Sequence, residues 1–360
     1  HFPLILRAFP LWSVSNLSAR SALPLVPGLF DLVIIDEASQ CDIASVVPLL
    51  ARSKRAVFVG DPMQLKHVST LDGAVEQTLL EQYELKDADV QRFTYRVNSA
   101  FDLGDSSPNL SDVGRVRLDL HFRSHGEIAA YCNEAFYAKT LHVVTVTEKL
   151  KIPHDMRPGI HWTHVDGQLK PGPTGAWCED EIEAIWRELK ALVERDYRGT
   201  IGVVTPFRHQ MLRMKDRLES SEALPSDFRE RSQLLVDTAY GFQGGERDLI
   251  LFSLCGGPAL PTGGALFFSK EPNQFNVAVS RARAILHVFG NQTWALNCGI
   301  SYIQSLARRT IPTETRPDEQ DDARYQSPWE KVLAQALRED RKSTRLNSSH
   351  SSVSRMPSSA

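Results

Sequence analysis

The sequence has no apolar run that approaches the roughly 20 residues needed to cross a bilayer. Residues 1–30 also lack the charged start and single apolar block of a secretory signal. The five cysteines are scattered and never spaced as C-x-x-C, which argues against a zinc site or a disulfide framework and fits a reducing cytoplasm. No strand-like run leads into G-x-G-x-x-G, so a dinucleotide-binding enzyme is not expected. The sequence therefore predicts a cytoplasmic protein without a membrane partner.

What is present is typical of a soluble globular protein. With 360 residues, the chain is long enough for two domains with separate cores. Its residues are 42% hydrophobic and 24% charged, which is the composition of soluble domains. The formal net charge is −3, so any contact with nucleic acid must come from local basic patches rather than from an overall positive field. Charge therefore leaves the kind of partner open.

Short apolar runs rich in β-branched residues alternate with amphipathic stretches along the chain. This pattern indicates an α/β fold with parallel sheets that are covered by helices on both faces. Buried strands are predicted at residues 32–35, 56–59, 201–205, 248–253 and 285–289. Apolar residues at helical spacing predict a helix over residues 179–195, and a second helix is predicted over residues 207–218.

Two stretches without apolar periodicity are predicted to be connections, the polar residues 94–116 and the acidic residues 314–326. Ser327 and Pro328 then have the residue types of the N-cap and the first position of a helix. The run of residues 340–350 resembles one translated frame of a sequencing-library adapter, so the Ser- and Arg-rich end is expected to be non-native. The predicted division is 1–116, 117–298, a linker at 299–326, a further segment at 327–339 and a non-native tail at 340–360.

Two adjacent carboxylates, Asp36 and Glu37, follow the apolar run 32–35, at the strand end where open α/β sheets bind ligands. In an ATP-driven motor, Asp36 would hold Mg²⁺ through its water shell and Glu37 would orient the attacking water. Gln64 follows the next strand after a Gly-Asp-Pro turn, where its amide could contact both a γ-phosphate oxygen and that water. The alternatives are a solvated strand end for the acid pair and a simple turn for Gly-Asp-Pro.

Three further motifs follow in order, at residues 118–128, 236–248 and 275–283. Together with residues 31–40 and 57–65, this ordered set resembles the motifs of superfamily 1 nucleic-acid helicases. The resemblance is to the Upf1-like branch, which includes the RNA-decay helicases and the replication helicase–nucleases, in its bacterial type. The fold that it implies is two RecA-like P-loop NTPase domains with parallel sheets, the first one truncated at its N-terminal side. The cofactors that it implies are ATP and Mg²⁺, bound between those domains.

The resemblance also implies roles for aromatic and basic residues of the second domain. Phe122 would stack on the adenine of ATP, and Arg123 would reach the γ-phosphate, with an ordinary surface salt bridge as the alternative for Arg123. A helix would present Arg281 as the arginine finger that stabilises charge on the transferring phosphoryl group. Arg283, two residues further along that helix, would have a supporting role.

Nucleic-acid contacts are implied by the same resemblance. Gln243 and Glu246 would couple the nucleotide to the strand being moved, and Thr238 would contact a phosphate of that strand. Arg208 and Gln210 follow a predicted strand and are further candidates for phosphate contacts, with a solvated helix start as the alternative. The implied partner is single-stranded DNA or RNA, and contacts to the backbone do not distinguish the two.

The phosphate-binding loop G-x-x-x-x-G-K-[ST] occurs nowhere in the sequence. Without its lysine and backbone amides, the β- and γ-phosphates lose their main anchor, so negligible ATP turnover is expected from this chain alone. Two other functions stay open: a translocase that does not unwind duplex, and a non-catalytic nucleic-acid-binding remnant of a helicase. Residues 327–339 resemble the start of a nuclease-like domain, with a C-terminal packing helix as the alternative.

Overall fold

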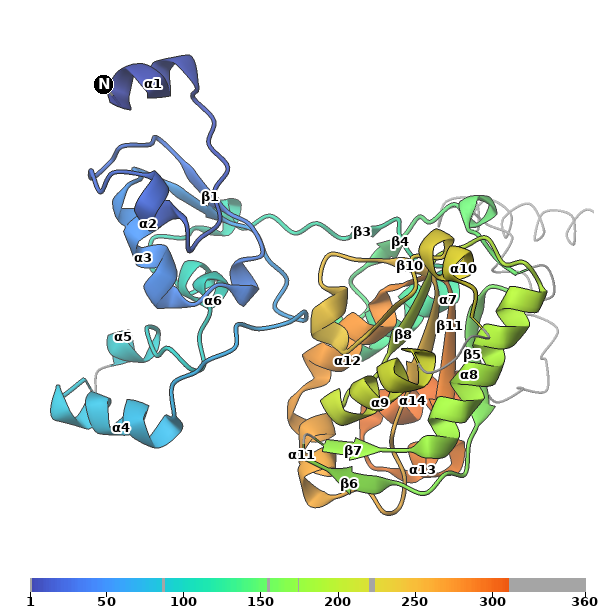
Figure 1. Ribbon diagram of the computed structural model, residues 1–360. Helices are drawn as coiled ribbons and strands as arrows, with labels where there is room; N and C mark the ends of the chain where they lie inside the picture. The colour runs from blue at the N-terminus through green and yellow to red at the C-terminus, as the bar shows by residue number, and fades with distance from the viewer. Residues whose placement is uncertain (1, 86–87, 154–155, 174, 220–223, 311–360) are drawn as a thin grey trace, which may run out of the picture. The chain divides into compact units, whose positions relative to one another are not determined.

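The computed structural model describes residues 2–85, 88–153, 156–173, 175–219 and 224–310. The chain forms two compact units (Figure 1). The first unit comprises His1–Leu118 together with Glu271–Val277, and the second comprises Asp119–Lys270 together with Ala278–Ala360. Within the described ranges, no helix is both long enough and apolar enough to cross a membrane.

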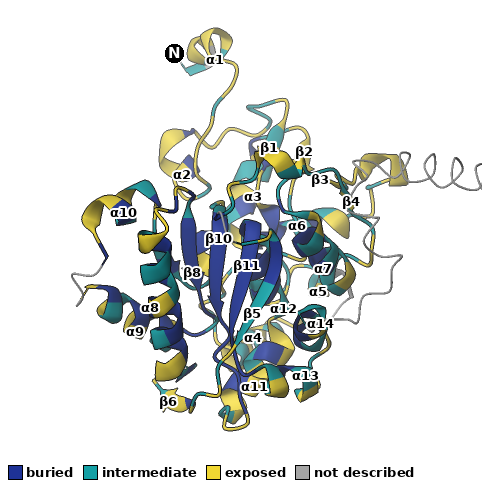
Figure 2. Cartoon of the chain, turned by 90° about the vertical axis from the view of Figure 1, so that its right-hand side faces the viewer, coloured by how far each residue is buried: buried dark blue, intermediate teal, exposed yellow. Residues whose placement is uncertain are grey.

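A five-stranded parallel sheet forms the centre of the second unit, with the strand order β5-β11-β10-β8-β9. The strands are β5 (Gly159–His164), β8 (Ile201–Val204), β9 (Leu235–Asp237), β10 (Arg247–Ser253) and β11 (Ala282–Gly290). Almost every residue of β8, β10 and β11 is buried (Figure 2), which confirms the buried strands predicted for this half of the chain. Burial on both faces explains why these runs are continuously apolar rather than alternating. The predicted α/β fold class is confirmed.

Helices cover both faces of this sheet (Figure 2). On one face, α8 (Glu179–Glu194) packs against β10 and β11, and α9 (Arg208–Glu219) packs against α8 and β9. On the other face lie α7 (Gly126–Phe136), α13 (Gln292–Asn297) and α14 (Ser301–Arg309). The helices predicted over 179–195 and 207–218 are thus confirmed to within one residue at each end.

The apolar spacing of α8 explains both its helical form and its orientation. Ile185 and Leu189 recur on one face at helical spacing, and both are completely buried against the sheet. Burial of one such side chain stabilises the fold by roughly 1.5–3 kcal/mol. The three acidic residues of its first turn complement the positive end of the helix dipole.

Smaller elements complete the second unit. The two residues of β3 (Leu120–His121) pair in parallel with β4 (His142–Val143), and β6 (Lys170–Gly172) forms an antiparallel hairpin with β7 (Gly175–Trp177). Two further helices are α10 (Ser226–Arg231) and α11 (Thr262–Lys270). The next helix, α12 (Pro272–Ser280), begins in the first unit and ends in the second. Short 3-10 turns occupy Thr147–Lys149 and Ala239–Phe242.

The first unit has a small core around a pair of parallel strands, β1 (Val33–Ile35) and β2 (Ala56–Phe58). These strands end at the 3-10 turn Ala38–Gln40, which packs with α3 (Ile43–Ala51) and α6 (Ala100–Asp105) around Ile35 and Val46. The other elements of this unit are α1 (Phe2–Ala8), α2 (Ala19–Ala22), α4 (Gly73–Gln82), α5 (Ala88–Gln91) and the 3-10 turn Asp112–Gly114.

The prediction that β1 and β2 are buried strands is wrong for one of their faces. Ile34 is 61% exposed and Val57 is 44% exposed, although Ile35 of the same strand is 5% exposed. Side chains alternate across a strand, and the described elements of this unit cover only the face that carries Ile35. An apolar run therefore predicted the strands correctly but not their burial.

The structure also corrects two predicted connections. Residues 94–116 contain α6, which begins with a capping box between Ser99 and Asp102 and buries Ala100 in the core of the first unit. The predicted linker 299–326 contains α14, whose Ile303 is completely buried. Both helices are too short for their periodicity to stand out in the sequence. The connection at 314–326, the segment 327–339 and the tail 340–360 lie outside the described residues.

Candidate nucleotide and nucleic-acid sites

The acid pair of the first unit lies directly after β1 in a strained turn. The Asp36 carboxylate is exposed, and its Oδ1 accepts a hydrogen bond from the Glu37 backbone N–H at 2.9 Å. Glu37 has φ 49° and ψ 41°, a left-handed conformation that costs a non-glycine residue about 1–3 kcal/mol. The side-chain amide of Gln40 donates to Glu37 Oε2 at 2.8 Å. The turn thus holds the Glu37 carboxylate in a defined position at the carboxyl end of the strand.

The Gly-Asp-Pro turn after β2 packs against the 3-10 turn that follows the acid pair. A Cβ on Gly60 would lie 3.0 Å from the Ser39 backbone nitrogen, so any larger residue would push the two turns slightly apart. Asp61 accepts from the Met63 N–H and from the Gln64 side-chain amide, both at 2.9 Å. Asp61 thus holds the Gln64 side chain at the turn after β2, and its role at a phosphate stays a prediction.

Two asparagines that the sequence did not single out hold the same turn from within the first unit. Asn273 Nδ2 donates to the backbone oxygens of Pro62 and Gln64, at 2.8 and 2.7 Å. Asn276 Nδ2 donates to the Met63 carbonyl at 2.8 Å and is itself completely buried. Three successive carbonyls of the loop are thus satisfied by side chains. The sequence could have indicated these two residues only by position, since Asn276 lies within the motif at residues 275–283 and Asn273 lies just before it.

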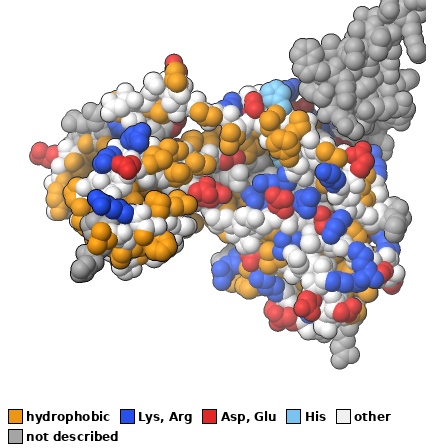
Figure 3. All heavy atoms as spheres, turned by 90° about the horizontal axis from the view of Figure 1, so that it is seen from above, with side chains coloured by type: hydrophobic (Ala, Val, Ile, Leu, Met, Phe, Trp, Pro, Cys, Tyr) orange, Lys and Arg blue, Asp and Glu red, His pale blue; other side chains and the backbone are white. Residues whose placement is uncertain are grey.

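In the second unit, charged residues from three motifs form one cluster. Arg123 Nε lies 2.5 Å from Glu246 Oε1, and Arg283 Nε lies 3.7 Å from Glu246 Oε2. Arg283 Nη1 is also 3.5 Å from Asp248, whose other carboxylate oxygen accepts from the N–H and hydroxyl of Thr200. Figure 3 shows basic and acidic side chains side by side on a surface of the second unit. The structure therefore brings together Arg123, Glu246 and Arg283.

The expected helical positions of the two motif arginines are wrong. Helix α12 ends at Ser280, Arg281 follows it, and Arg283 belongs to β11. The chain changes to extended structure here because residues 282–290 pair with β10 in the centre of the sheet, from Ala282 opposite Arg247 onward. Arg281 is only 4% exposed, so its side chain is packed in the protein rather than presented on an open surface.

Phe122 and His121 lie where β3 ends. The Phe122 ring is 66% exposed and therefore open to stacking. His121 Nε2 accepts a hydrogen bond from the Ser124 backbone N–H at 3.0 Å, which requires an unprotonated nitrogen. Burial, with a smaller contribution from Arg123, lowers the pKa of His121 and keeps it in that neutral form.

The loop after β9 carries the residues expected to contact the nucleic acid. Thr238 is half-buried, and its backbone N–H donates to Asp237 Oδ1 at 2.7 Å. Gln243 is exposed on the same loop. Arg208, at the first position of α9, is also exposed. These three side chains stay candidates for nucleic-acid contact.

The expectation that Gln210 contacts nucleic acid is wrong, because its side chain is completely buried. Its Oε1 accepts from the Cys178 N–H at 2.9 Å, and its Nε2 donates to the Ser253 hydroxyl at 2.9 Å. Ser253 in turn donates to Glu181 at 2.6 Å. Two residues after Arg208, helical rotation turns the side chain toward the sheet instead of the solvent.

Glu181 is a buried carboxyl group that sequence reasoning missed. Besides the Ser253 hydroxyl, it accepts from the Cys255 N–H at 2.9 and 3.1 Å. Burial raises its pKa to about 8, although these hydrogen bonds act in the opposite direction. In the sequence it is one of three acids in the first turn of a helix, so nothing distinguished it from solvated neighbours. Its place identifies it as a structural link between α8 and the end of β10.

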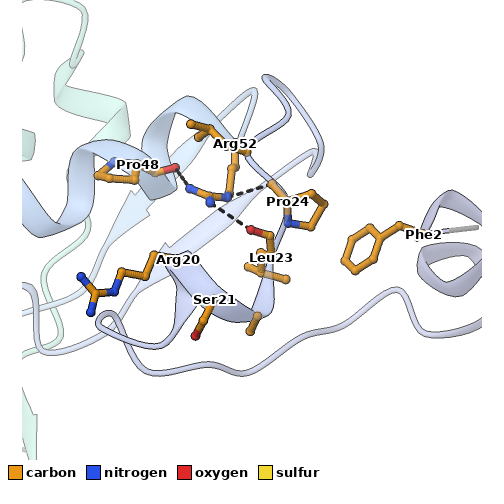
Figure 4. Close-up of a pocket in the computed structure, with 9 residues that line it drawn as sticks. Phe2, Arg20, Ser21, Leu23, Pro24, Pro48 and Arg52 are labelled. Atoms are coloured by element: carbon orange, nitrogen blue, oxygen red, sulfur yellow. Dashed lines mark hydrogen bonds between the residues drawn. The ribbon is translucent and has the colours of Figure 1, made fainter.

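A cavity of about 660 Å³ lies in the first unit, between α2 and the end of α3 (Figure 4). The buried Arg52 lines it and donates to the carbonyls of Leu23, Pro24 and Pro48 at 2.7–3.0 Å. None of the expected nucleotide-site residues is part of its wall. Because its one buried guanidinium is already bound to carbonyls, this cavity is a packing feature and not the candidate site.

Two family models match the chain, both described as AAA domain, one over residues 106–293 and the other over residues 15–69. The helicase SEN1 of Saccharomyces cerevisiae is 30% identical over 288 residues, a stretch that covers 76% of this chain and 12% of that protein. The uncharacterized ATP-dependent helicase MG140 of Mycoplasma genitalium is 25% identical over 301 residues, covering 80% of this chain and 25% of that protein. An arterivirus helicase, nonstructural protein 10 in a complex with DNA, is 12% identical with a TM-score of 0.31, covering 71% of this chain and 39% of its own. The chain thus spans about a quarter of the length of the curated relatives that head the comparison, and less of SEN1.

Proposed function

Because this chain belongs to the AAA-domain family of superfamily 1 helicases, in the Upf1-like branch, we propose that the protein uses ATP hydrolysis to move along single-stranded DNA or RNA. The observation that carries the proposal is the close packing of two turns in the first unit. One turn presents Asp36 and Glu37, and the other holds Gln64. A carboxylate for a metal, a second carboxylate for water and an amide for phosphate are the groups that phosphoryl transfer to water needs.

In this proposal, Asp36 holds Mg²⁺ through water ligands. Its exposed carboxylate fits that role, since one oxygen accepts only a backbone N–H and hard oxygen ligands suit Mg²⁺. The ion would supply neutralising charge to the phosphates. Glu37, oriented by Gln40, accepts a proton from the attacking water, and Gln64 donates one amide hydrogen to the γ-phosphate while the other binds Asp61.

The second unit carries further candidate groups for the nucleotide. Phe122 offers an exposed ring for the adenine, and Arg123 neutralises charge on the phosphoryl group. Arg281, which is 4% exposed, would first have to become accessible to a phosphate. Glu246 contacts Nε of Arg123, and a phosphate would bind through the terminal guanidinium nitrogens of the arginine. Gln243 then lies on the same loop as Thr238, which makes this loop the proposed connection between nucleotide and nucleic acid.

Thr238 and Arg208 are the proposed phosphate contacts of the nucleic-acid strand. Both are accessible at the ends of neighbouring strands of the same sheet. A hydroxyl and a guanidinium recognise the sugar–phosphate backbone without reading bases. The proposal therefore covers both DNA and RNA.

A second candidate function is nucleic-acid binding without catalysis. It is favoured by one observation, the absence of G-x-x-x-x-G-K-[ST] from these 360 residues. For the chain alone we expect negligible ATP turnover, because it lacks the loop that anchors the phosphates. Turnover above background by the purified chain would contradict this expectation.

The decisive experiment measures nucleic-acid-stimulated ATP hydrolysis by the protein expressed from its complete reading frame. We expect Glu37→Gln to lower the rate by roughly 10²–10⁴-fold, because it removes the base but keeps the side-chain shape. The matched control is Glu81→Gln, which changes an exposed acid on α4 of the same unit. A protein that binds single strands but shows no ATP hydrolysis, with or without Glu37, would support the second candidate instead.

A further inference from the structure

Two cations lie over one indole ring at a surface of the second unit that no motif includes. Lys170 Nζ is 4.7 Å from the centre of the Trp177 ring, and Arg213 Cζ is 4.3 Å from it. Trp177 lies in the hairpin β6–β7, which packs beside the start of α9 at the lower edge of this unit in Figure 1. Both cationic side chains are exposed, while the ring between them is half-buried. The three side chains are called the Trp177 patch below.

Local structure explains why these residues converge. Lys170 and Trp177 are direct cross-strand partners in the antiparallel hairpin, so their side chains share one face. On α9, His209 and Arg213 are four residues apart and therefore also share a face. The His209 ring meets the Trp177 ring edge-on at 6.0 Å. Hairpin and helix thus present one continuous surface.

The hairpin is held against α9 at its turn. Gly175 has φ +104°, and a Cβ there would lie 2.6 Å from the Phe207 ring, so only glycine permits this approach. Phe207 is buried just before α9 begins. The position of the Trp177 patch is therefore set by the core of the unit rather than by a free loop.

Among the residues that the structure describes, the charges of the Trp177 patch have no acidic partner. Elsewhere on α9, Lys215 pairs with Asp237 and Arg217 pairs with Glu183. In the part of the chain that the structure describes, neither Lys170 nor Arg213 lies within ion-pair distance of a carboxylate. Two cations that contact one ring without a carboxylate partner among the described residues leave positive charge at this surface, which a bound anion would neutralise.

We propose that Lys170 and Arg213, positioned by Trp177, bind backbone phosphates of a single-stranded nucleic acid. The inference rests on the proposed function and extends its contacts along α9 from Arg208, which lies five residues, or about 7.5 Å of helix axis, before Arg213. Phosphate is the anion that both cations recognise, and its repetition along a strand suits contacts spaced along a helix. Trp177 is a positioning residue that keeps the two cations together.

The test uses the 360-residue chain and a fluorescently labelled oligothymidylate of roughly 20 nucleotides, titrated at several salt concentrations. Each phosphate contact to a single strand contributes about 0.7 to the slope of log affinity against log salt. We expect the double variant Lys170→Gln with Arg213→Gln to reduce that slope by about 1.4. Trp177→Ala is expected to reduce it as well, whereas Trp177→Phe, which keeps a ring, is expected to retain most of it.

A matched control exists in the same unit. Lys190 and Arg217 lie over the Trp186 ring at 6.0 and 4.6 Å, but Arg217 is already paired with Glu183. The double variant Lys190→Gln with Arg217→Gln removes the same charge and should leave the slope within about 0.7 of that of the unaltered chain. Thermal unfolding of each variant, expected to change little, shows that lost binding is not lost folding.

The possible failures are distinguishable. If the double variant of the Trp177 patch and the control variant have the same slope, the patch inference is overturned and the proposed function stands. If the unaltered chain does not bind the oligonucleotide even at the lowest salt, the inference falls together with the nucleic-acid part of the proposed function. If substitutions in the Trp177 patch weaken binding but Arg208→Gln does not, the patch binds nucleic acid, and only the proposed course of the strand along α9 from Arg208 is wrong.

Discussion

Arg123 and Glu246 form an ion pair that joins two motifs of the second unit, the bend after β3 and the loop before β10. The Glu246 carboxylate also lies 3.7 Å from Arg283, so it stands between two guanidinium groups. About a third of each side chain of the Arg123–Glu246 pair is exposed, and such pairs contribute at most about 1 kcal/mol to stability. We therefore expect the pair to matter for the orientation of Arg123 rather than for stability.

This arrangement predicts the effect of Glu246→Gln. The variant should lower nucleic-acid-stimulated ATP hydrolysis by about a hundredfold, since Arg123 loses its orientation. Its free energy of unfolding should change by less than about 1 kcal/mol. The control is Glu134→Gln, which breaks the surface pair with Arg309 in the same unit. Equal ATPase rates for the two variants would contradict a positioning role for Glu246.

Gln210 is buried and Arg208 is exposed on the same helix, so we expect substitution of Gln210 to affect stability and substitution of Arg208 to affect nucleic-acid binding. Gln210→Ala removes the acceptor of the buried Cys178 N–H and one of the two hydrogen bonds of the Ser253 hydroxyl, which should lower the free energy of unfolding by about 1–3 kcal/mol. Arg208→Gln should leave stability unchanged but weaken oligonucleotide binding and lower its salt slope by about 0.7. Denaturation and binding titrations of both variants check this. If the Gln210→Ala chain were as stable as the unaltered chain but bound the oligonucleotide more weakly, Gln210 would be a nucleic-acid contact after all.

Glu181 predicts a fall in stability with rising pH. Its pKa is raised from 4.5 to about 8 on folding, so the folded chain holds a proton that the unfolded chain releases between these values. The contribution of Glu181 is therefore fully present below pH 4.5 and is lost as the pH rises through about 8. Glu181→Gln, which mimics the protonated group, should gain stability relative to the unaltered chain as the pH is raised across this window. Denaturant unfolding at both ends of the window measures it, and a constant difference would contradict the raised pKa.

His287 predicts that stability falls as the pH is lowered, the opposite direction to the effect of Glu181. Burial lowers its pKa from 6.5 to about 3, and its Nε2 lies 2.7 Å from the Thr163 hydroxyl. The unfolded chain therefore takes up a proton first, and this contribution to stability is present above pH 6.5 and is lost as the pH falls toward 3. His287→Gln should lose less stability than the unaltered chain over that range. The exposed His142→Gln serves as the control, and identical pH profiles for both variants would show that His287 is not buried in its neutral form.

Part of the fold could be read from local patterns. The apolar spacing of residues 179–195 predicts both α8 and the face that it buries, because helical periodicity is a property of the segment itself. Continuous apolar runs likewise predict β8, β10 and β11. The same signal overestimated the burial of β1 and β2, since whether a strand is covered on one face or two depends on its neighbours.

The site shows the same limit at single residues. The ordered motifs located Asp36, Glu37, Gln64 and Arg123, but not the side-chain partners that hold them. Nothing in the sequence indicated that Gln210 points into the sheet, or that Arg283 belongs to a strand rather than a helix. Each of these depends on how one element is rotated against another, which a local pattern does not contain.

By itself, the sequence determined the α/β class, the order of the motifs and the family, because residue types and their spacing along the chain carry that information. Only the tertiary structure decided that Glu181 and Gln210 share a buried network, and that Lys170 and Arg213 meet over Trp177. Lys170 and Arg213 are far apart in the sequence, and strand register together with helix rotation brings them within reach of one ring. The packing of the sheet against its helices determines the strand register and the helix rotation. That packing minimises the free energy of the whole core rather than of any one segment.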